Sequence, residues 1–119
     1  MIKRIFIEKK NEFQTAKNIL KQTILSDIGV ELHGLRSFVI YEIFNVSEDA
    51  FESIKWQVLA EKATDEIFES INLSYFQYLS YTYLPGQYDQ RADSAMQCIG
   101  LLGYSEVIIQ CAELLVFQP

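Results

Sequence analysis

Residues 83–98, YLPGQYDQRADSAMQC, mark the change from a strand to a helix. The segment before them, residues 75–84, is rich in Tyr, Phe and Leu, which is typical of a buried strand, and Pro85-Gly86 ends it. From Asp89 onward the apolar residues recur at helical spacing, and Asp89 is expected to cap that helix. The polar residues of the run are therefore predicted to lie in a strand-to-helix turn.

This turn supplies the candidate binding or contact residues. Its first helical turn leaves backbone N–H groups that could receive an anion or a carboxylate, and the planar fork of Arg91 suits a carboxylate or phosphate. A local ion-pair network of Asp89, Arg91 and Asp93 explains the same charges as readily. The candidate residues are Gln87, Asp89, Gln90, Arg91, Asp93 and Ser94.

The helix of this run is expected to pack on a sheet through one face of small and apolar residues: Ala92, Ala95, Met96, Ile99 and Leu102. A first helix, from about 11 to 27, has its apolar residues on one face and is expected to end at Gly29. That face consists of Phe13, Ala16, Leu20, Ile24 and Ile28. A second helix is predicted to begin after Ser47, which can cap it.

Strands are predicted at 2–8, 35–46, 75–84 and 106–117, with a short edge strand within 64–70. The chain thus contains two copies of a strand-helix-strand plan, at 2–46 and 75–117. We expect a single domain over residues 1–119 of the α+β class, ferredoxin-like, with helices on one face of a mainly antiparallel sheet. The duplication is one of topology, because the two copies do not align by residue identity.

Composition excludes several classes of function. The formal net charge of −6 argues against a nucleic-acid partner or an anionic membrane surface, because phosphate binding needs clustered Lys and Arg. No apolar run is long enough to span a bilayer and no signal peptide opens the chain, so a soluble, cytoplasmic protein is expected. Cys98, Cys111 and His33 have no metal-ligand spacing, and the two cysteines are expected to be buried thiols. Ser94 and Cys98 have no histidine in sequence context, so no nucleophile-base pair is predicted.

The run LPGQYDQRADSAMQC resembles a segment near the N-terminus of the large single-chain phosphoribosylformylglycinamidine synthases. The opening, MIKRIFIEKK, is similar to the start of the same family, and Gly34-Leu35-Arg36 followed by residues 41–46, YEIFNV, is similar to its second strand. Together these segments cover most of the chain in the family's order.

The resemblance implies the N-terminal domain of an ATP-dependent glutamine amidotransferase of purine biosynthesis, a ligase that converts formylglycinamide ribonucleotide to formylglycinamidine ribonucleotide. It implies that ATP and magnesium bind in other domains, that the glutaminase cysteine lies in another domain, and that this chain alone is not catalytic and holds no cofactor. Its partners would be the synthase and glutaminase domains, with the Gln87–Ser94 turn as a contact. The resemblance also implies that this domain corresponds to two fused copies of the small separate subunit found in multi-subunit versions of the enzyme.

A second hypothesis is a free-standing, dimeric, small-ligand-binding or regulatory module of ferredoxin-like fold that senses an anion at the same turn. The first copy is followed by a helix and a short strand, whereas the second stops at Gln118-Pro119. We therefore expect the family pattern to continue past Pro119, and an exposed part of the sheet to promote self-association.

Overall fold

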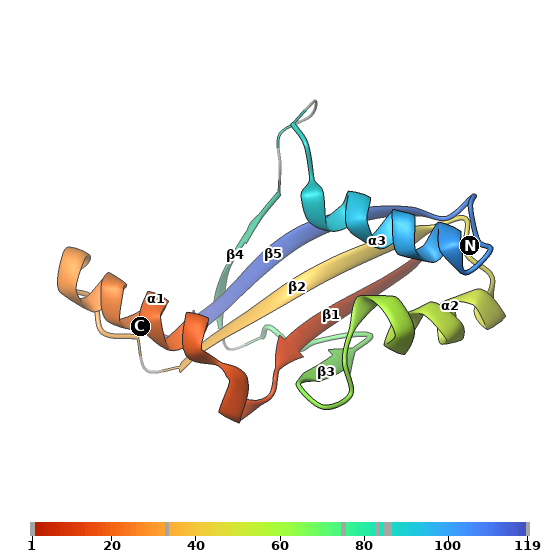
Figure 1. Ribbon diagram of the computed structural model, residues 1–119. Coiled ribbons are helices and arrows are strands. Elements are labelled where there is room, and N and C mark those ends of the chain that lie inside the picture. Colours follow the sequence, from red (N-terminus) through yellow and green to blue (C-terminus); the bar gives the residue numbers. More distant parts are fainter. Residues whose placement is uncertain (1, 33, 75, 83, 85–86, 119) are drawn as a thin grey trace.

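The computed structural model describes residues 2–32, 34–74, 76–82, 84 and 87–118. The chain has the predicted α+β fold, in which antiparallel strands form one sheet and helices pack against it (Figure 1). The strands are β1 (Lys3–Lys9), β2 (Gly34–Phe44), β3 (Asp65–Phe68), β4 (Gln77–Tyr81) and β5 (Ile108–Gln118). The helices are α1 (Thr15–Ile28), α2 (Glu48–Ile54) and α3 (Gln90–Leu101). A 3-10 turn, Asn11–Phe13, precedes α1, and a π-helical turn, Lys55–Leu59, extends α2.

The strand order β3-β1-β2-β5-β4 places the two longest strands at the centre of the sheet. β2 and β5 pair over their full lengths, from Gly34 opposite Gln118 to Phe44 opposite Ile108. β1 pairs with β2 on one side, β4 pairs with β5 on the other, and β3 extends the sheet beyond β1. Because side chains alternate along each strand, the sheet has two faces with different covers.

α2 and α3 cover one face of the sheet, and the larger core lies beneath them (Figure 1). Ile5 and Ile43 of the sheet meet Phe51 of α2 and Ile99 of α3 there, and all four side chains are fully buried. Burial of this apolar surface is the main force that holds the two helices on the sheet.

The start of α2 confirms the capping prediction, because the Ser47 hydroxyl accepts a hydrogen bond from the Ala50 N–H at 3.1 Å. Trp56, in the turn that follows α2, packs against the same core and lies beneath the Lys62 ammonium, 5.8 Å from the ring centroid. The Trp56 indole therefore makes packing and cation–π contacts within this domain.

The opposite face of the sheet carries a smaller core, whose buried residues are Phe38, Ile40, Leu114 and Val116. The connection between β3 and β4 covers it with Ile71, Leu73 and Phe76. At its margin the buried Glu8 carboxylate accepts two hydrogen bonds from the Arg36 guanidinium, at 2.8 and 3.0 Å. The guanidinium also lies over the rings of Phe38 and Phe68.

The predicted burial of the first helix is wrong. α1 begins at Thr15, ends at Gly29 as expected, and has no buried residue among those whose side chains the structure describes. Leu20 and Ile24 are half-buried, whereas Ala16 and Ile28 are exposed. The reason is its position, because α1 projects beyond one end of the sheet instead of lying across it (Figure 1). The side chain of Phe13 lies outside the described part.

The prediction of a buried strand at 75–84 is also wrong. β4 is an edge strand paired only with β5 among the described residues, and all five of its side chains are exposed. Local aromatic content indicated burial, but burial needs a cover on the strand that the described residues do not supply.

The packing face of α3 agrees with the prediction except at its end. Ala92, Ala95 and Ile99 are buried and Met96 packs against them, whereas Leu102, at the C-cap, is largely exposed. Cys98 is exposed on the outer side of α3, so the expectation of two buried thiols holds for Cys111 only.

The register of the sheet defines a two-fold relation between the two strand-helix-strand units. The number of residues from the start of β1 to the start of β4 equals the number from the start of β2 to the start of β5. The ladders agree: Ile7 pairs with Val39 in the first unit, and Tyr81 pairs with Glu113 in the second. Val39 and Glu113 also pair with each other, so the two-fold axis passes between them.

The helices follow the same interval. It also separates Gly29 after α1 from Gly103 after α3, and both glycines have positive φ, 79° and 100°. Such φ values favour glycine, so a left-handed glycine follows each helix, as the C-cap of α1 and one residue after the C-cap of α3. The relation places the counterpart of β3 outside β4, where no described residue pairs.

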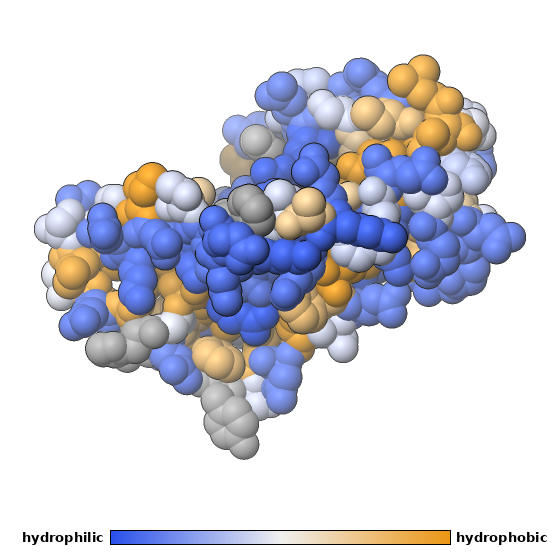
Figure 2. Space-filling view, turned by 60° about the horizontal axis from the view of Figure 1, so that its bottom comes forward, coloured by the Kyte–Doolittle hydropathy of each residue, from blue (hydrophilic) through white to orange (hydrophobic). Residues whose placement is uncertain are grey.

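Figure 2 shows the molecule from below, with hydrophilic residues across the middle of this face and hydrophobic residues in separate patches toward its margins. Among the described residues, no helix has both the length and the apolar character needed to cross a membrane.

Candidate functional site

The candidate site begins where the chain enters α3. Asp89 has an extended backbone, and its Oδ1 accepts a hydrogen bond from the Ala92 N–H at 3.0 Å, so it caps the helix as predicted. The small side chains of Ala92 and Ala95 let α3 approach the sheet closely. Because the Asp89 carboxylate already occupies an N–H of the first turn, the helix start alone offers less to an external anion.

Gln87 is held within the turn that precedes α3. Its Oε1 accepts a hydrogen bond from the Leu84 N–H at 3.0 Å, and its own N–H donates to the Leu84 carbonyl at the same distance. The side-chain N–H groups of Gln87 are thus the part of this amide left for other contacts.

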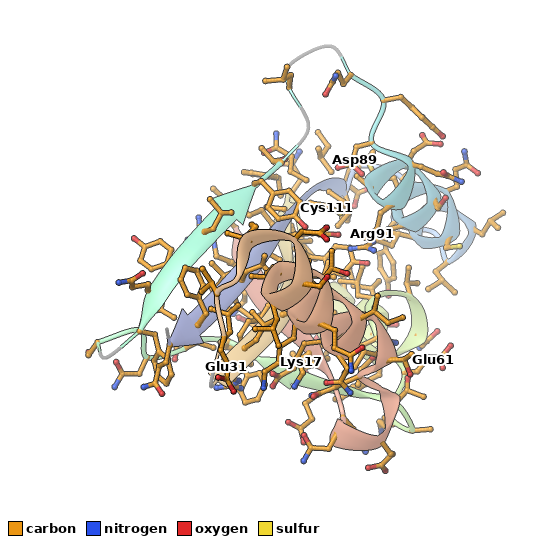
Figure 3. The ribbon with its side chains drawn as sticks, turned by 90° about the vertical axis from the view of Figure 1, so that its left-hand side faces the viewer. Lys17, Glu31, Glu61, Asp89, Arg91 and Cys111 are labelled. Atoms are coloured by element: carbon orange, nitrogen blue, oxygen red, sulfur yellow. The ribbon has the colours of Figure 1, made fainter. Side chains whose placement is uncertain are left out.

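A hollow of about 590 Å³ lies between this turn, the start of α3 and β5. Five of the six candidate residues line it: Gln87, Asp89, Gln90, Arg91 and Ser94. The other lining residues come from β4, the segment after it, and β5: Tyr81, Thr82, Cys111, Ala112 and Glu113. Figure 3 shows Asp89, Arg91 and Cys111 close together beside the start of α3.

Asp93, the sixth candidate residue, does not line this hollow. Its Oδ2 accepts hydrogen bonds from the Tyr88 hydroxyl at 2.8 Å and from the Gln97 side-chain amide at 2.9 Å. These contacts hold Asp93 on the outer side of α3, away from Arg91.

Arg91 pairs across the hollow. Its Nη1 lies 3.7 Å from Oε1 of Glu113 on β5, so the ion pair links helix and sheet; the ion pairs of the described residues do not join Arg91 to Asp89 or Asp93. Glu113 also accepts a hydrogen bond from the Tyr81 hydroxyl on β4. The Thr82 hydroxyl donates to the Cys111 carbonyl at 2.8 Å. These contacts join β4, β5 and α3 at one wall.

The protonation of two lining groups is fixed near neutral pH. The hydrogen bond to Glu113, together with burial, raises the pKa of Tyr81 to about 12. Burial raises the pKa of the Cys111 thiol to about 12, the negative charge of Asp89 adds to this effect, and Arg91 offsets it in part. Tyr81 therefore stays a phenol and Cys111 stays a thiol.

A second hollow, of about 260 Å³, lies on the same face of the sheet, and Arg91 lines both. Lys17 of α1, Ser37 and Tyr41 of β2, and Asp65 of β3 line the second hollow. Tyr41 is only 8% exposed, and burial raises the pKa of its hydroxyl to about 12. Among the described residues, none hydrogen-bonds this hydroxyl.

The sequence did not predict the lining residues contributed by the sheet, of which Glu113 and Tyr41 bear most on the chemistry of the two hollows. Glu113 is the single charged residue within 108–118, so a lone carboxylate in an apolar strand was the signal that could have identified it. Tyr41 carried no such signal, because tyrosine is ordinary in a strand and only the packing shows that its hydroxyl lacks a partner.

No cluster of three or more His, Cys, Asp or Glu side chains suited to a metal ion occurs in the described part of the chain. His33 lies outside the described residues. Comparisons of the chain with protein-family models, with curated proteins and with solved structures find no match.

Proposed function

We propose that this chain is the N-terminal interface domain of a phosphoribosylformylglycinamidine synthase. One observation carries the proposal: the run that resembles this family, LPGQYDQRADSAMQC, supplies five polar side chains to the larger hollow. A stretch that served only to link a strand to a helix would not need five polar groups facing one space.

The chemistry of the lining groups supports a contact role within the enzyme. Cys111 and Tyr81 stay protonated near neutral pH, with pKa values of about 12, so neither is prepared to act as a nucleophile or base. Amide and guanidinium groups, which Gln87, Gln90 and Arg91 supply, are suited to bind backbone carbonyls and carboxylates of a neighbouring domain.

In this proposal the synthase and glutaminase domains are the partners, and ATP, magnesium and the glutaminase cysteine belong to them. The enzyme would act in the cytoplasm, in purine biosynthesis. The domain would help to shape the substrate pocket or the ammonia route through the Gln87–Ser94 turn.

The first test is the reading frame beyond the codon for Pro119 in the source DNA. A frame that continues into a long chain with a glutaminase-type Cys, His and Glu set is the expected result. A stop at or near Pro119 would contradict the single-chain form of the proposal.

The second test uses the whole enzyme with Gln90→Ala and Arg91→Ala. We expect each to lower the glutamine-dependent rate about tenfold, which is roughly 1.4 kcal/mol in the barrier. Gln22→Ala is the matched control, because Gln22 is exposed on α1 and lines neither hollow. Unchanged glutamine-dependent and ammonia-dependent rates in both test variants would exclude this role for the turn.

A further inference from the structure

Two cationic side chains from different helices line the smaller hollow. Lys17 lies near the start of α1, and Arg91 lies near the start of α3, separated by the same interval that relates β1 to β4. They therefore hold equivalent positions in the two strand-helix-strand units. Figure 3 labels Lys17 on α1 and Arg91 beside α3.

Each of the two acidic residues that line this hollow, Glu8 and Asp65, forms an ion pair. Asp65 lies 2.7 Å from the Lys9 ammonium and accepts a hydrogen bond from the Glu61 N–H at 2.9 Å. The Glu8 carboxylate is bound by Arg36. Lys9, Lys17 and Arg91 outnumber Glu8 and Asp65 by one in the lining, so the hollow has one excess positive charge, although the whole chain has a net charge of −6.

The two cations retain capacity to bind a further group. The Lys17 ammonium donates to the Gln14 side-chain oxygen, which is neutral and leaves the charge uncompensated. Arg91 lies 3.7 Å from Glu113, beyond an ordinary hydrogen bond, so most of its five N–H donors have no acceptor among the described residues and can bind another one.

Tyr41 is the independent sign of a ligand. Its side chain is more than nine-tenths buried, it lines the hollow, and its hydroxyl has no partner among the described residues. The hydroxyl is not among the buried side-chain atoms that lack a partner, so it reaches the space of the hollow, where it can donate to a bound group that accepts a hydrogen bond.

We propose that this hollow binds a small oxyanion, the phosphate or carboxylate group of a metabolite, between Lys17 and Arg91, with the Tyr41 hydroxyl as a neutral donor. The volume of about 260 Å³ accommodates such a group. This inference goes beyond the interface function, because it concerns a site that the isolated chain already contains.

The experiment is a titration of the isolated chain with inorganic phosphate and, separately, with succinate, followed by amide chemical shifts at constant ionic strength. Saturable shifts at millimolar concentrations around Ser37, Tyr41 and Arg91 are expected. Preference for phosphate identifies a phosphate-bearing ligand, and preference for succinate identifies a carboxylate-bearing one. Lack of saturation with both ions overturns the proposal.

Variants separate this site from general charge effects. Lys17→Ala is expected to weaken binding about tenfold, as for loss of one charge-assisted contact, whereas Lys21→Ala, also on α1 but outside the hollow, leaves it unchanged. Tyr41→Phe keeps the ring and removes only the hydroxyl, so it also weakens binding. Equal effects of the two lysine variants, or unchanged binding in Tyr41→Phe, overturn the proposal.

A variant in the opposite direction completes the test. Glu113→Gln removes the anionic competitor of Arg91, so it is expected to tighten binding severalfold. Weaker or unchanged binding in this variant would contradict the assigned role of Arg91. None of these results depends on enzyme rates, so failure here is distinct from failure of the proposed interface.

Discussion

The ion pairs of this sheet differ in how much they contribute to stability, because they differ in burial. Glu8 is buried and bound by two hydrogen bonds from Arg36, whereas in the Arg4–Glu42 pair, at 2.8 Å, the two side chains are 58% and 33% exposed. Exposed pairs contribute little because water and salt screen them, whereas a buried carboxylate that loses its partner is strongly destabilising.

Arg36→Ala is therefore expected to lower the free energy of unfolding by about 2 to 3 kcal/mol, since it leaves the Glu8 carboxylate unpaired; this is below the cost for a fully buried pair because Arg36 is 45% exposed. Urea denaturation followed by circular dichroism measures the change. Arg4→Ala is the control and should cost less than about 1 kcal/mol. Similar losses in the two variants would show that burial does not distinguish these pairs.

The buried thiol of Cys111 predicts how stability changes at alkaline pH. Its pKa is raised from 9.0 to about 12 in the folded chain, so deprotonation favours the unfolded state. This contribution to stability is complete below about pH 9 and is lost as the pH rises toward 12. Cys111→Ala should reduce the decline of the unfolding free energy across this range. An identical decline in the variant would contradict the prediction.

At the scale of elements, α1 and α3 hold equivalent positions but differ in packing. α3 buries Ala92, Ala95 and Ile99, whereas α1 has no buried residue whose side chain the structure describes. Helical stability in proteins comes mainly from the packed apolar face. The backbone amides of α1 are therefore expected to exchange with solvent faster than those of α3.

Hydrogen exchange measured by NMR tests this difference between the helices. Protection in α1 should remain well below that of α3 at the same pH, and Ile28→Gln should leave it unchanged because that side chain is exposed. Equal protection in the two helices would show that α1 has a cover that the described residues do not supply.

The sequence predicted the elements better than their burial. Helix boundaries depend on local chemistry, so Ser47, Asp89 and Gly29 were placed correctly. The burial of α1 and β4 depends on which elements lie beside them, which periodicity does not report. At the site, the polar run could be predicted from its own residues. Glu113 could not, because it lies on β5 and only the packing of α3 on the sheet brings it to the hollow.

At the scale of the whole molecule, the two edges of the sheet are unlike. β3 carries Asp65 and Glu66, whereas β4 has no charged residue and exposes Tyr78, Leu79 and Tyr81. Charged side chains on an edge discourage pairing with another chain, and β4 lacks this protection. Self-association through β4 is therefore expected.

Size-exclusion chromatography with light scattering tests this expectation over a range of concentrations. The chain should form dimers or larger species, and Leu79→Lys should shift it toward the monomer by adding a charge to the edge. Leu101→Lys, on an exposed part of α3, is the matched control and should have no such effect. A clean monomer at all concentrations would contradict the prediction.

The two-fold axis between Val39 and Glu113 has a consequence for how the two halves can vary. In a symmetric pair of identical subunits, a residue on the axis lies opposite its own copy, so a glutamate there would face a second glutamate. Like charges directly opposite each other in a ladder are destabilising. In this protein one chain contains both halves, so a substitution in one half leaves the other half unchanged. Val39 can therefore lie opposite Glu113, whose carboxylate pairs with Arg91. Covalent linkage thus permits an asymmetric site on a symmetric scaffold.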